Sequence, residues 1–563
     1  MELHQARNKQ PTTSMDLSLF NHNKLQTYAT QHQIDWVLLP REDEFLGEYV
    51  PSYNERLLWA SGFSGSAGIA IIGQTSAHLF VDGRYTLQAA DEGKDFEVHS
   101  LYEIWDWIKR TITPSDTVGL NLKLHTNNFV TKLKQHVQTV RHLDPHPVDQ
   151  LWTDRPLRPQ SVTVPHELKY SGESIESKLS RVRAAMAQNA EALYVHDPHD
   201  VAWVLNIRGQ DLPYTPITLA RALIWKNGVV NVFCDHTQIS DELRSHLGKN
   251  VQVYPESDLE QYLIKPTTLQ IDPAASAYDR DLVFGKDVVQ SSPISLMKAI
   301  KNSVEIEGMR KAHHWDGEAL RKFREWLYLQ EPTTLSEIKA ADQLEIFRRE
   351  SPYCKGLSFA SISGFGSNGA IVHYHSTEKS NRQFESQGLY LIDSGGQYLE
   401  GTTDITRVFA IGIPTDEQRK MYTLVLKGHL RLAMAVFPKG TTGHQLDVLA
   451  RYDLWQHGLN YDHGTGHGVG SYLSVHEGPQ GISPRVNTTP LQPGMVVSNE
   501  PGYYKAGEYG IRIENMMVVQ ESTHEGYLCF ETLTQVPYEE SLIDVTLLTD
   551  AELQYLNLKG GKS

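Results

Sequence analysis

Two aspartates late in the chain have the type and spacing of paired metal ligands. Asp393 ends the apolar run 389–393, a glycine-containing turn follows, and a second β-rich run carries Asp404. This pattern predicts a hairpin whose two strands each present one carboxylate. Neighbouring carboxylates repel each other unless a positive charge lies between them, and a metal ion commonly supplies that charge.

Three more candidate ligands follow the hairpin. His467 lies in the string HGTGHGVG at 463–470, Glu500 precedes Pro-Gly, and Glu514 ends GIRIE. Four carboxylates and one imidazole suit a pair of divalent ions such as Mn²⁺, Co²⁺ or Zn²⁺, and the excess of oxygen ligands favours Mn²⁺. Any one of these acids alone would be interpreted as a solvated or salt-bridged residue. The ordered set of five, each in a glycine-rich or β-rich frame, favours a metal site.

The strings around these residues resemble those of the pita-bread metallopeptidases, and within them the three-domain cytosolic type of Xaa-Pro aminopeptidase (aminopeptidase P). The resemblance extends from about residue 17 to the C-terminus. It implies a metal-dependent aminopeptidase that hydrolyses the N-terminal Xaa-Pro bond with a hydroxide held between two divalent ions, most simply Mn²⁺. The matching strings are IDSG at 392–395, GTTDITR at 401–407, HGTGHGVG at 463–470, VHEGP at 475–479, EPGYY at 500–504 and GIRIEN at 510–515.

The same resemblance implies a role for each ligand. Asp404 and Glu514 would bridge the two ions, and Asp393 would complete the coordination of one of them. His467 and Glu500 would complete the other ion. Glu500 is also implied to hold and pass on the proton taken from the attacking water.

Three further histidines occupy matching places, namely His373, His463 and His476. The resemblance implies that they are catalytic, through hydrogen bonds to the substrate carbonyl and to the tetrahedral oxyanion. Protonation of the leaving imino nitrogen is a further role open to them. His463 has the alternative of only shaping the pocket.

Arg512 and Tyr503 are candidate residues around the ligands. Arg512 alternates with Glu514 along a predicted strand, so both side chains point to one face, and Arg512 is expected to orient a ligand carboxylate. The preference for proline comes from the resemblance alone. It requires an apolar pocket for the pyrrolidine ring, and Tyr503 and Tyr504 are candidate walls.

The composition excludes several function classes. The chain has 563 residues, 40% hydrophobic and 21% charged, with a formal net charge of −16. That charge disfavours nucleic acid and anionic membranes as partners. Residues 1–14 lack the apolar core of a secretory signal, and no run approaches the roughly 20 apolar residues of a membrane span. Three widely spaced cysteines give no disulfide framework, so a cytoplasmic protein is expected.

The elements that must position the site fall into several regions. The sequence predicts a disordered tail at 1–15, an α/β domain at 16–152, a second α/β domain at 160–294 that repeats its order of elements, and a catalytic domain at 295–563. In the last, Asn302, Thr334-x-x-Glu337 and Thr415-x-x-Gln418 are expected to cap helices that pack on a curved, mostly antiparallel sheet. This fold class, α/β with creatinase-like N-terminal domains and a pita-bread domain, matches the resemblance.

Related functions remain as alternatives. A prolidase would use the same five ligands to cleave Xaa-Pro dipeptides, but prolidases usually have one N-terminal domain. Methionine aminopeptidases are generally shorter, and creatinase lacks the metal ligands. A non-catalytic pita-bread scaffold for binding peptides should have lost ligands that this chain retains. The expected partners are peptides with proline at the second position and a second copy of the chain, with no nucleic acid and no membrane.

Overall fold

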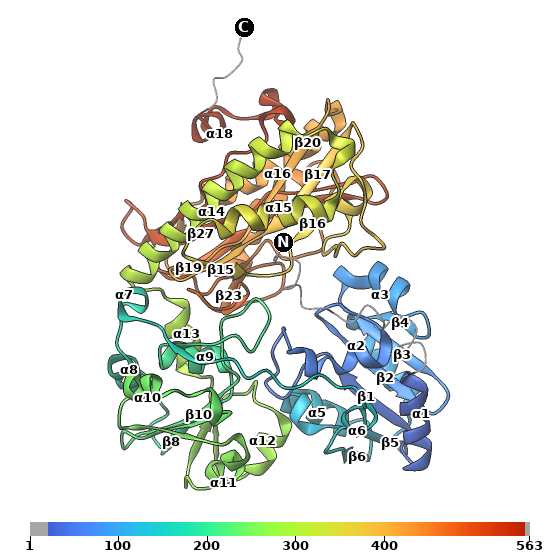
Figure 1. The fold of residues 1–563 in the computed structure, drawn as a ribbon, viewed down its shortest axis with the longest axis vertical. Helices are drawn as coiled ribbons and strands as arrows, with labels where there is room; N and C mark the ends of the chain where they lie inside the picture. The colour runs from blue at the N-terminus through green and yellow to red at the C-terminus, as the bar shows by residue number, and fades with distance from the viewer. Residues whose placement is uncertain (1–20, 558–563) are drawn as a thin grey trace.

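The computed structural model describes residues 21–557, so the predicted disordered tail at 1–15 lies outside the described residues. Three parts of the chain are arranged around one another (Figure 1): residues 21–151 (domain I, blue), residues 160–294 (domain II, green) and residues 295–557 (domain III, yellow to red). Domains I and II lie side by side, and an isolated bridge pairs Thr126 with Ser276 between them. The boundaries predicted at 152, 160 and 294 stay predictions.

Domain I is a six-stranded sheet covered by helices on both faces. On one face, Leu25, Leu57 and Val148 from three helices pack against the sheet. On the other face, Trp107 and Leu133 from two helices pack against it. The strand order is β4 (Glu97–Ser100), β3 (Ala77–Val81), β2 (Gly68–Gly73), β1 (Trp36–Pro40), β5 (Thr117–Leu120), β6 (Thr139–His142). Burial on both faces explains why the central strands β1, β2 and β3 are mostly apolar. The helices include α1 (Asn21–Gln31), α2 (Arg56–Ser61), α4 (Ile104–Thr111), α5 (Asn127–Lys134) and α6 (Pro147–Leu151).

Domain II repeats this topology strand for strand. Its first strand pairs antiparallel with one neighbour and parallel with the other, as β1 does in domain I. The outer pairs agree as well, since both edges of each sheet are parallel. The prediction of two related α/β domains is therefore confirmed. The strand order is β12 (Val251–Tyr254), β11 (Val230–Phe233), β10 (Arg221–Trp225), β8 (Ala192–Val195), β13 (Leu269–Ile271), β14 (Asp287–Val289).

Domain III packs long helices on antiparallel sheets, as predicted. Asn302 caps α14 (Ser303–Leu329) and Thr415 caps α16 (Asp416–Ala433), each with a complete capping box. The box predicted at Thr334 is wrong, because α15 (Glu337–Arg349) begins after Ser336, whose hydroxyl accepts from Lys339 N. The central strands are β16 (Ile362–Phe365), β17 (Gly388–Ser394) and β20 (Ile405–Ile411) in one sheet, and β22 (Gly466–Gly468), β24 (Val496–Asn499) and β27 (Asn515–Glu521) in another.

Candidate active site

The predicted carboxylate hairpin is present in domain III. Strands β17 and β20 pair antiparallel, with Asp393 opposite Thr406. Asp393 therefore lies at the end of one strand, and Asp404 immediately precedes the other. A small second hairpin, β18 (Gly396–Tyr398) and β19 (Gly401–Thr402), fills the turn between them. Glu514 joins them from the link between β26 (Tyr509–Arg512) and β27, where its backbone N–H donates to the Thr406 carbonyl at 3.2 Å.

His467 and Glu500 come from the neighbouring sheet. His467 lies in β22 and Glu500 follows β24 directly. Nε2 of His467 lies 3.4 Å from a carboxylate oxygen of Asp404 and 3.4 Å from one of Glu500. Asp404, His467 and Glu514 offer ligand atoms that all lie within 4.8 Å of one another. The structure thus brings the sequence-predicted ligands of two sheets to one place.

The electrostatics of the carboxylates show how unfavourable their proximity is without a cation. Burial, then the charges of Asp393 and Glu500, raise the pKa of Asp404 well above its ordinary value. Burial, then the charges of Asp404 and the other acids, likewise raise the pKa of Glu514. Within residues 21–557, Oδ1 of Asp393 and Oδ1 of Asp404 are buried and make no hydrogen bond. Buried, unpartnered and mutually repelling oxygens beside an imidazole fit the donor set of divalent cations.

The tautomer of His467 suits a metal ligand. Its Nδ1 lies 3.0 Å from the carbonyl of Gly468, which can only accept, so Nδ1 carries the proton. The lone pair of Nε2 therefore points toward Asp404 and Glu500. Ser498 holds both neighbours, since its hydroxyl accepts from His467 N at 2.9 Å and donates to Glu500 at 3.0 Å. Sequence reasoning missed Ser498, although its position two residues before Glu500 on one strand was a usable signal.

Arg512 and Thr406 support the carboxylates from behind. Arg512 is fully buried and donates to Asp393 at 2.7 Å, to the hydroxyl of Tyr504 at 2.7 Å and to the hydroxyl of Thr406 at 3.2 Å. The Thr406 hydroxyl in turn donates to Glu514 at 2.8 Å. One threonine thus links the arginine to a second ligand. Strand alternation predicts the contact of Arg512 with a carboxylate but not the part played by Thr406.

The two tyrosines of β25 (Gly502–Lys505) face opposite sides of their strand. The Tyr504 hydroxyl contacts Arg512 and Nε2 of His463, the latter at 2.8 Å. Tyr503 instead packs against Tyr509, with ring centroids 6.2 Å apart. The structure therefore brings Tyr504, and not Tyr503, to the candidate site.

The other two histidines reach residues of domain I. His476 stacks edge-on against His467, with centroids 4.4 Å apart, and its Nδ1 donates to Glu48 at 2.8 Å. Nδ1 of His373 lies 3.1 Å from the hydroxyl of Tyr85. Sequence reasoning missed Glu48 and Tyr85, because they precede their partners by 428 and 288 residues and no motif connects them.

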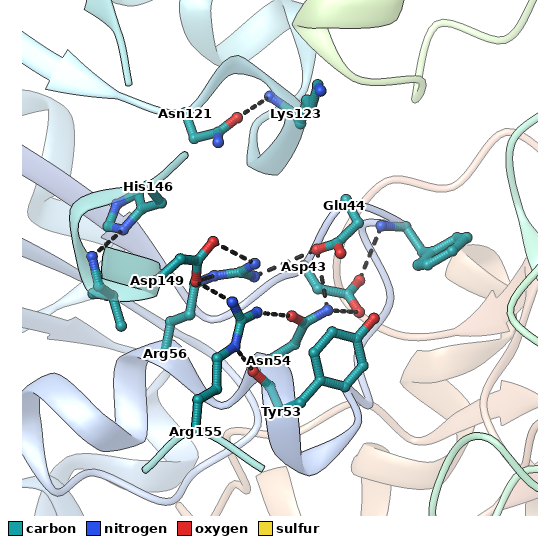
Figure 2. A network of polar contacts seen from close by, with 12 residues as sticks. Asp43, Glu44, Tyr53, Asn54, Arg56, Asn121, Lys123, His146, Asp149 and Arg155 are labelled. Carbon is teal, nitrogen blue, oxygen red and sulfur yellow. Dashed lines mark hydrogen bonds and ion pairs between the residues drawn. The ribbon is translucent and has the colours of Figure 1, made fainter. Parts of the chain in front are cut away.

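A buried polar network anchors the segment that carries Glu48 (Figure 2). Asn54 donates to Asp43 at 3.1 Å and to Glu44 at 3.0 Å, so it holds the carboxylates of both neighbouring residues. Arg56 reaches from Glu44 to Asp149, to which it donates two hydrogen bonds of 2.7 and 3.1 Å. The segment leading to Glu48 is therefore tied to the last helix of domain I.

Comparison with protein families agrees with this arrangement. A model described as metallopeptidase family M24 matches residues 307–521, and one for the C-terminal region of that family matches residues 526–558. Two models described as creatinase/prolidase N-terminal domains match residues 22–151 and 154–305. The families thus account for the catalytic-type domain and for both α/β domains.

Individual relatives cover nearly the whole chain. A probable Xaa-Pro aminopeptidase P from Laccaria bicolor is 40% identical over 566 residues, which covers 95% of this chain and 88% of that protein. The crystal structure of an X-prolyl aminopeptidase from Caenorhabditis elegans, a cytosolic enzyme with a di-nuclear active site, matches with a TM-score of 0.90 at 32% identity, covering 96% of this chain and 93% of that one. A Xaa-Pro dipeptidase from Bacillus anthracis matches with a TM-score of 0.55 at 25% identity and covers 65% of this chain and 99% of its own.

None of the helices within residues 21–557 is both long enough and apolar enough to span a bilayer.

Proposed function

The chain belongs to metallopeptidase family M24, among its Xaa-Pro aminopeptidases, and we propose that it removes the first residue from peptides whose second residue is proline. The observation that carries this proposal is the buried cluster of Asp393, Asp404, His467 and Glu514, with Glu500 beside it. Its oxygens repel one another and two of them make no hydrogen bond. This cluster is suited to holding two divalent metal ions, with Mn²⁺ favoured by the oxygen-rich donor set.

The family resemblance implies a part for each residue that would hold the ions. Asp404 and Glu514 would bridge the ions, Asp393 would complete one ion, and His467 with Glu500 would complete the other. When bound, the two ions would supply a hydroxide nucleophile at neutral pH and polarise the scissile carbonyl. The fixed hydrogen bonds of Arg512 to Asp393 and of Thr406 to Glu514 orient these carboxylates.

Glu500 is suited to accept a proton from the attacking water. Burial raises its pKa, and the charges of His467 and Arg512 partly oppose that rise. A carboxyl with a raised pKa is a stronger proton acceptor, which suits this role. We predict that Glu500→Gln keeps the fold but lowers kcat by about 10³-fold or more, because the amide cannot take up the proton. Activity like that of the wild type would remove Glu500 from the mechanism.

The histidines around the ligands would bind the substrate. Glu48 occupies Nδ1 of His476 and leaves Nε2, which must also carry a proton to donate to the substrate carbonyl or oxyanion. Nε2 of His463 is engaged by the Tyr504 hydroxyl, which supports the alternative that this histidine shapes the pocket. His373 is positioned at the boundary with domain I by Tyr85.

Proline at the second position is supported by the relatives rather than by the ligands. An Xaa-Pro bond has no amide N–H, so the site need not satisfy one. Cleavage of Xaa-Pro dipeptides is the second candidate function. The matching dipeptidase structure from Bacillus anthracis covers 65% of this chain, however, and leaves about a third of the chain without a counterpart. We further infer a cytoplasmic enzyme that acts as a homodimer, in line with the cytosolic C. elegans protein and with the prevalence of two-fold pairing.

Hydrolysis of three peptides tests the proposal. With added Mn²⁺, we expect release of arginine from Arg-Pro-Pro but not from Arg-Ala-Ala, and no cleavage of the dipeptide Ala-Pro. Exhaustive chelation should abolish the activity and Mn²⁺ should restore it. Cleavage of Ala-Pro alone would assign the chain as a prolidase, and full activity after verified metal removal would exclude the metal mechanism.

A further inference from the structure

Domain I carries a second group of metal-binding side chain types, outside the candidate active site. His78 lies on β3, and Glu97 and His99 lie on the neighbouring edge strand β4. The strands run parallel, with His78 opposite Glu97 and Phe80 opposite His99. Because Glu97 and His99 are two residues apart on one strand, they point to the same face of the sheet as His78. The register therefore brings the three side chains together.

The ligand atoms of the three side chains lie within 4.8 Å of one another. Nδ1 of His78 lies 3.1 Å from Nε2 of His99 and 3.3 Å from a carboxylate oxygen of Glu97. Nε2 of His99 lies 3.7 Å from the other oxygen of Glu97. In a tetrahedral site with metal–ligand bonds of about 2.0–2.1 Å, two ligand atoms lie about 3.3–3.4 Å apart. The two nitrogens and the carboxylate therefore lie close enough together to share one ion, with one oxygen of Glu97 near each imidazole.

The imidazoles are held in place before any ion binds. The ring of His78 packs against Trp107 with centroids 4.6 Å apart, and the ring of His99 stacks on Phe80 at 4.8 Å. Nε2 of His78 lies 3.1 Å from the hydroxyl of Ser76, so a proton on Nε2 leaves the lone pair of Nδ1 for a ligand. The histidine side chains are 10% and 13% exposed and Glu97 is 68% exposed, which leaves the fourth position open to water.

We propose that His78, Glu97 and His99 bind one divalent transition-metal ion of the Zn²⁺ class, separate from the active-site ions. Two imidazole nitrogens and one carboxylate oxygen suit Zn²⁺, whereas Mg²⁺ and Ca²⁺ require more oxygen ligands. The ion links the edge strand β4 to β3. Since β3 leads directly into the segment that ends at Tyr85, the ion stabilises the part of domain I that contacts His373.

Zinc binding to the full-length protein tests this site. Wild type, His99→Gln and Glu97→Gln are each dialysed against micromolar free Zn²⁺, and bound metal is measured by mass spectrometry. We expect about three Zn²⁺ per chain for the wild type and about two for His99→Gln, because the active site also takes up zinc. Glu97→Gln should weaken the third site by about tenfold or more. Its exposed side chain keeps this variant informative even if His99→Gln fails to fold.

Two controls separate the site from other sources of zinc. His32→Gln removes a histidine that directly follows α1 and whose Nδ1 lies 2.9 Å from the Tyr28 carbonyl, and it should bind as much Zn²⁺ as the wild type. All variants should keep Mn²⁺-dependent peptidase activity, because the residues lie outside the active site. Equal zinc content in wild type and Glu97→Gln, or a third ion that appears only at millimolar Zn²⁺, would overturn the proposal and leave a hydrogen-bonded histidine pair.

Discussion

Domains I and II have the same sheet order but contact domain III in different ways. Domain I touches the candidate catalytic histidines themselves, through Glu48 at His476 and Tyr85 at His373. Domain II contacts domain III elsewhere, through the ion pair of Asp200 with Lys298 at 2.9 Å and through the backbone of domain III. Arg208 donates to the carbonyls of residues 472 and 471 at 2.6 and 3.1 Å, and the carbonyl of residue 214 accepts from domain III at 2.9 Å.

The difference shows what duplication of a fold permits. One copy supplies side chains that position reacting groups, and its loops are free to diverge in chemistry. The other copy holds the segment around Tyr472, whose positive φ of 51° is a conformation that needs support. Function therefore depends on the loops after each strand and not on the shared sheet.

The loops after the first strand of each sheet illustrate this divergence. In domain I, burial and then the charge of Glu44 raise the pKa of Asp43 to about 7. In domain II, burial also opposes ionisation of Asp197, but His199 and Lys298 outweigh it and the pKa is lowered. Corresponding loops thus carry aspartates with opposite preferences for the proton.

The largest expected effect comes from breaking the backbone contacts of domain II. Arg208→Met should lower the free energy of unfolding by about 3 kcal/mol, because several buried carbonyls lose their donor. The activity of the protein that remains folded should change by less than about threefold, since no catalytic group is touched. Urea unfolding together with kcat/KM measures both effects. Arg181→Met removes an exposed ion pair with Glu173 and serves as the control, with a loss below about 1 kcal/mol.

Part of this organisation could be predicted from the sequence. Local patterns predict the hairpin of Asp393 and Asp404 and the helix cap at Asn302, because a few consecutive residues determine them. The cap predicted at Thr334 failed because Glu337 has another use: its carboxylate accepts from Phe365 N at 2.8 Å and from Arg382 N at 2.9 Å. These hydrogen bonds come from distant segments of domain III, so the residues next to Glu337 in sequence do not predict them.

The contacts of domain I with the site were beyond sequence reasoning for a similar reason. Glu48 and Tyr85 lie in loops with no metal or nucleotide motif, and only the packing of two domains brings them to the histidines. Ser498 and Thr406 are an intermediate case. Each lies two residues from a predicted ligand, so strand alternation predicts the face to which its side chain points but not the hydrogen bonds that it makes.

The next prediction concerns Asp43 and pH. A carboxyl whose pKa is higher in the folded state binds more protons when folded, so stability is greatest at low pH and falls as pH rises from about 4 to about 7. One pKa unit corresponds to about 1.4 kcal/mol, and sharing of the buried site with Glu44 leaves an expected loss of about 2 kcal/mol. Urea unfolding at pH 5 and pH 8 measures it.

Asp43→Asn should remove this dependence, because the amide does not titrate. Asp197 gives the opposite sign, since a lowered pKa stabilises the fold above the unfolded value of about 4, and that stability is lost as pH falls. Asp197→Asn should therefore leave the change between pH 5 and pH 8 unaltered. An equal change between these pH values in wild type and Asp43→Asn would contradict the assignment to domain I.

The smallest expected effect comes from removing one oxygen atom from domain I, and it tests the difference between domains I and II most directly. Tyr85→Phe deletes the hydroxyl that lies 3.1 Å from His373 and 2.8 Å from Ser66. A hydrogen bond of this kind contributes about 1 kcal/mol, so kcat should fall by about fivefold with little change in stability. Tyr254→Phe removes a tyrosine hydroxyl from domain II, which donates to Gln252 at 2.8 Å, and should leave kcat unchanged. If the two variants lose activity equally, domain I has no special part in positioning the histidine; if only Tyr85→Phe loses it, the two copies of the fold differ in function as their contacts indicate.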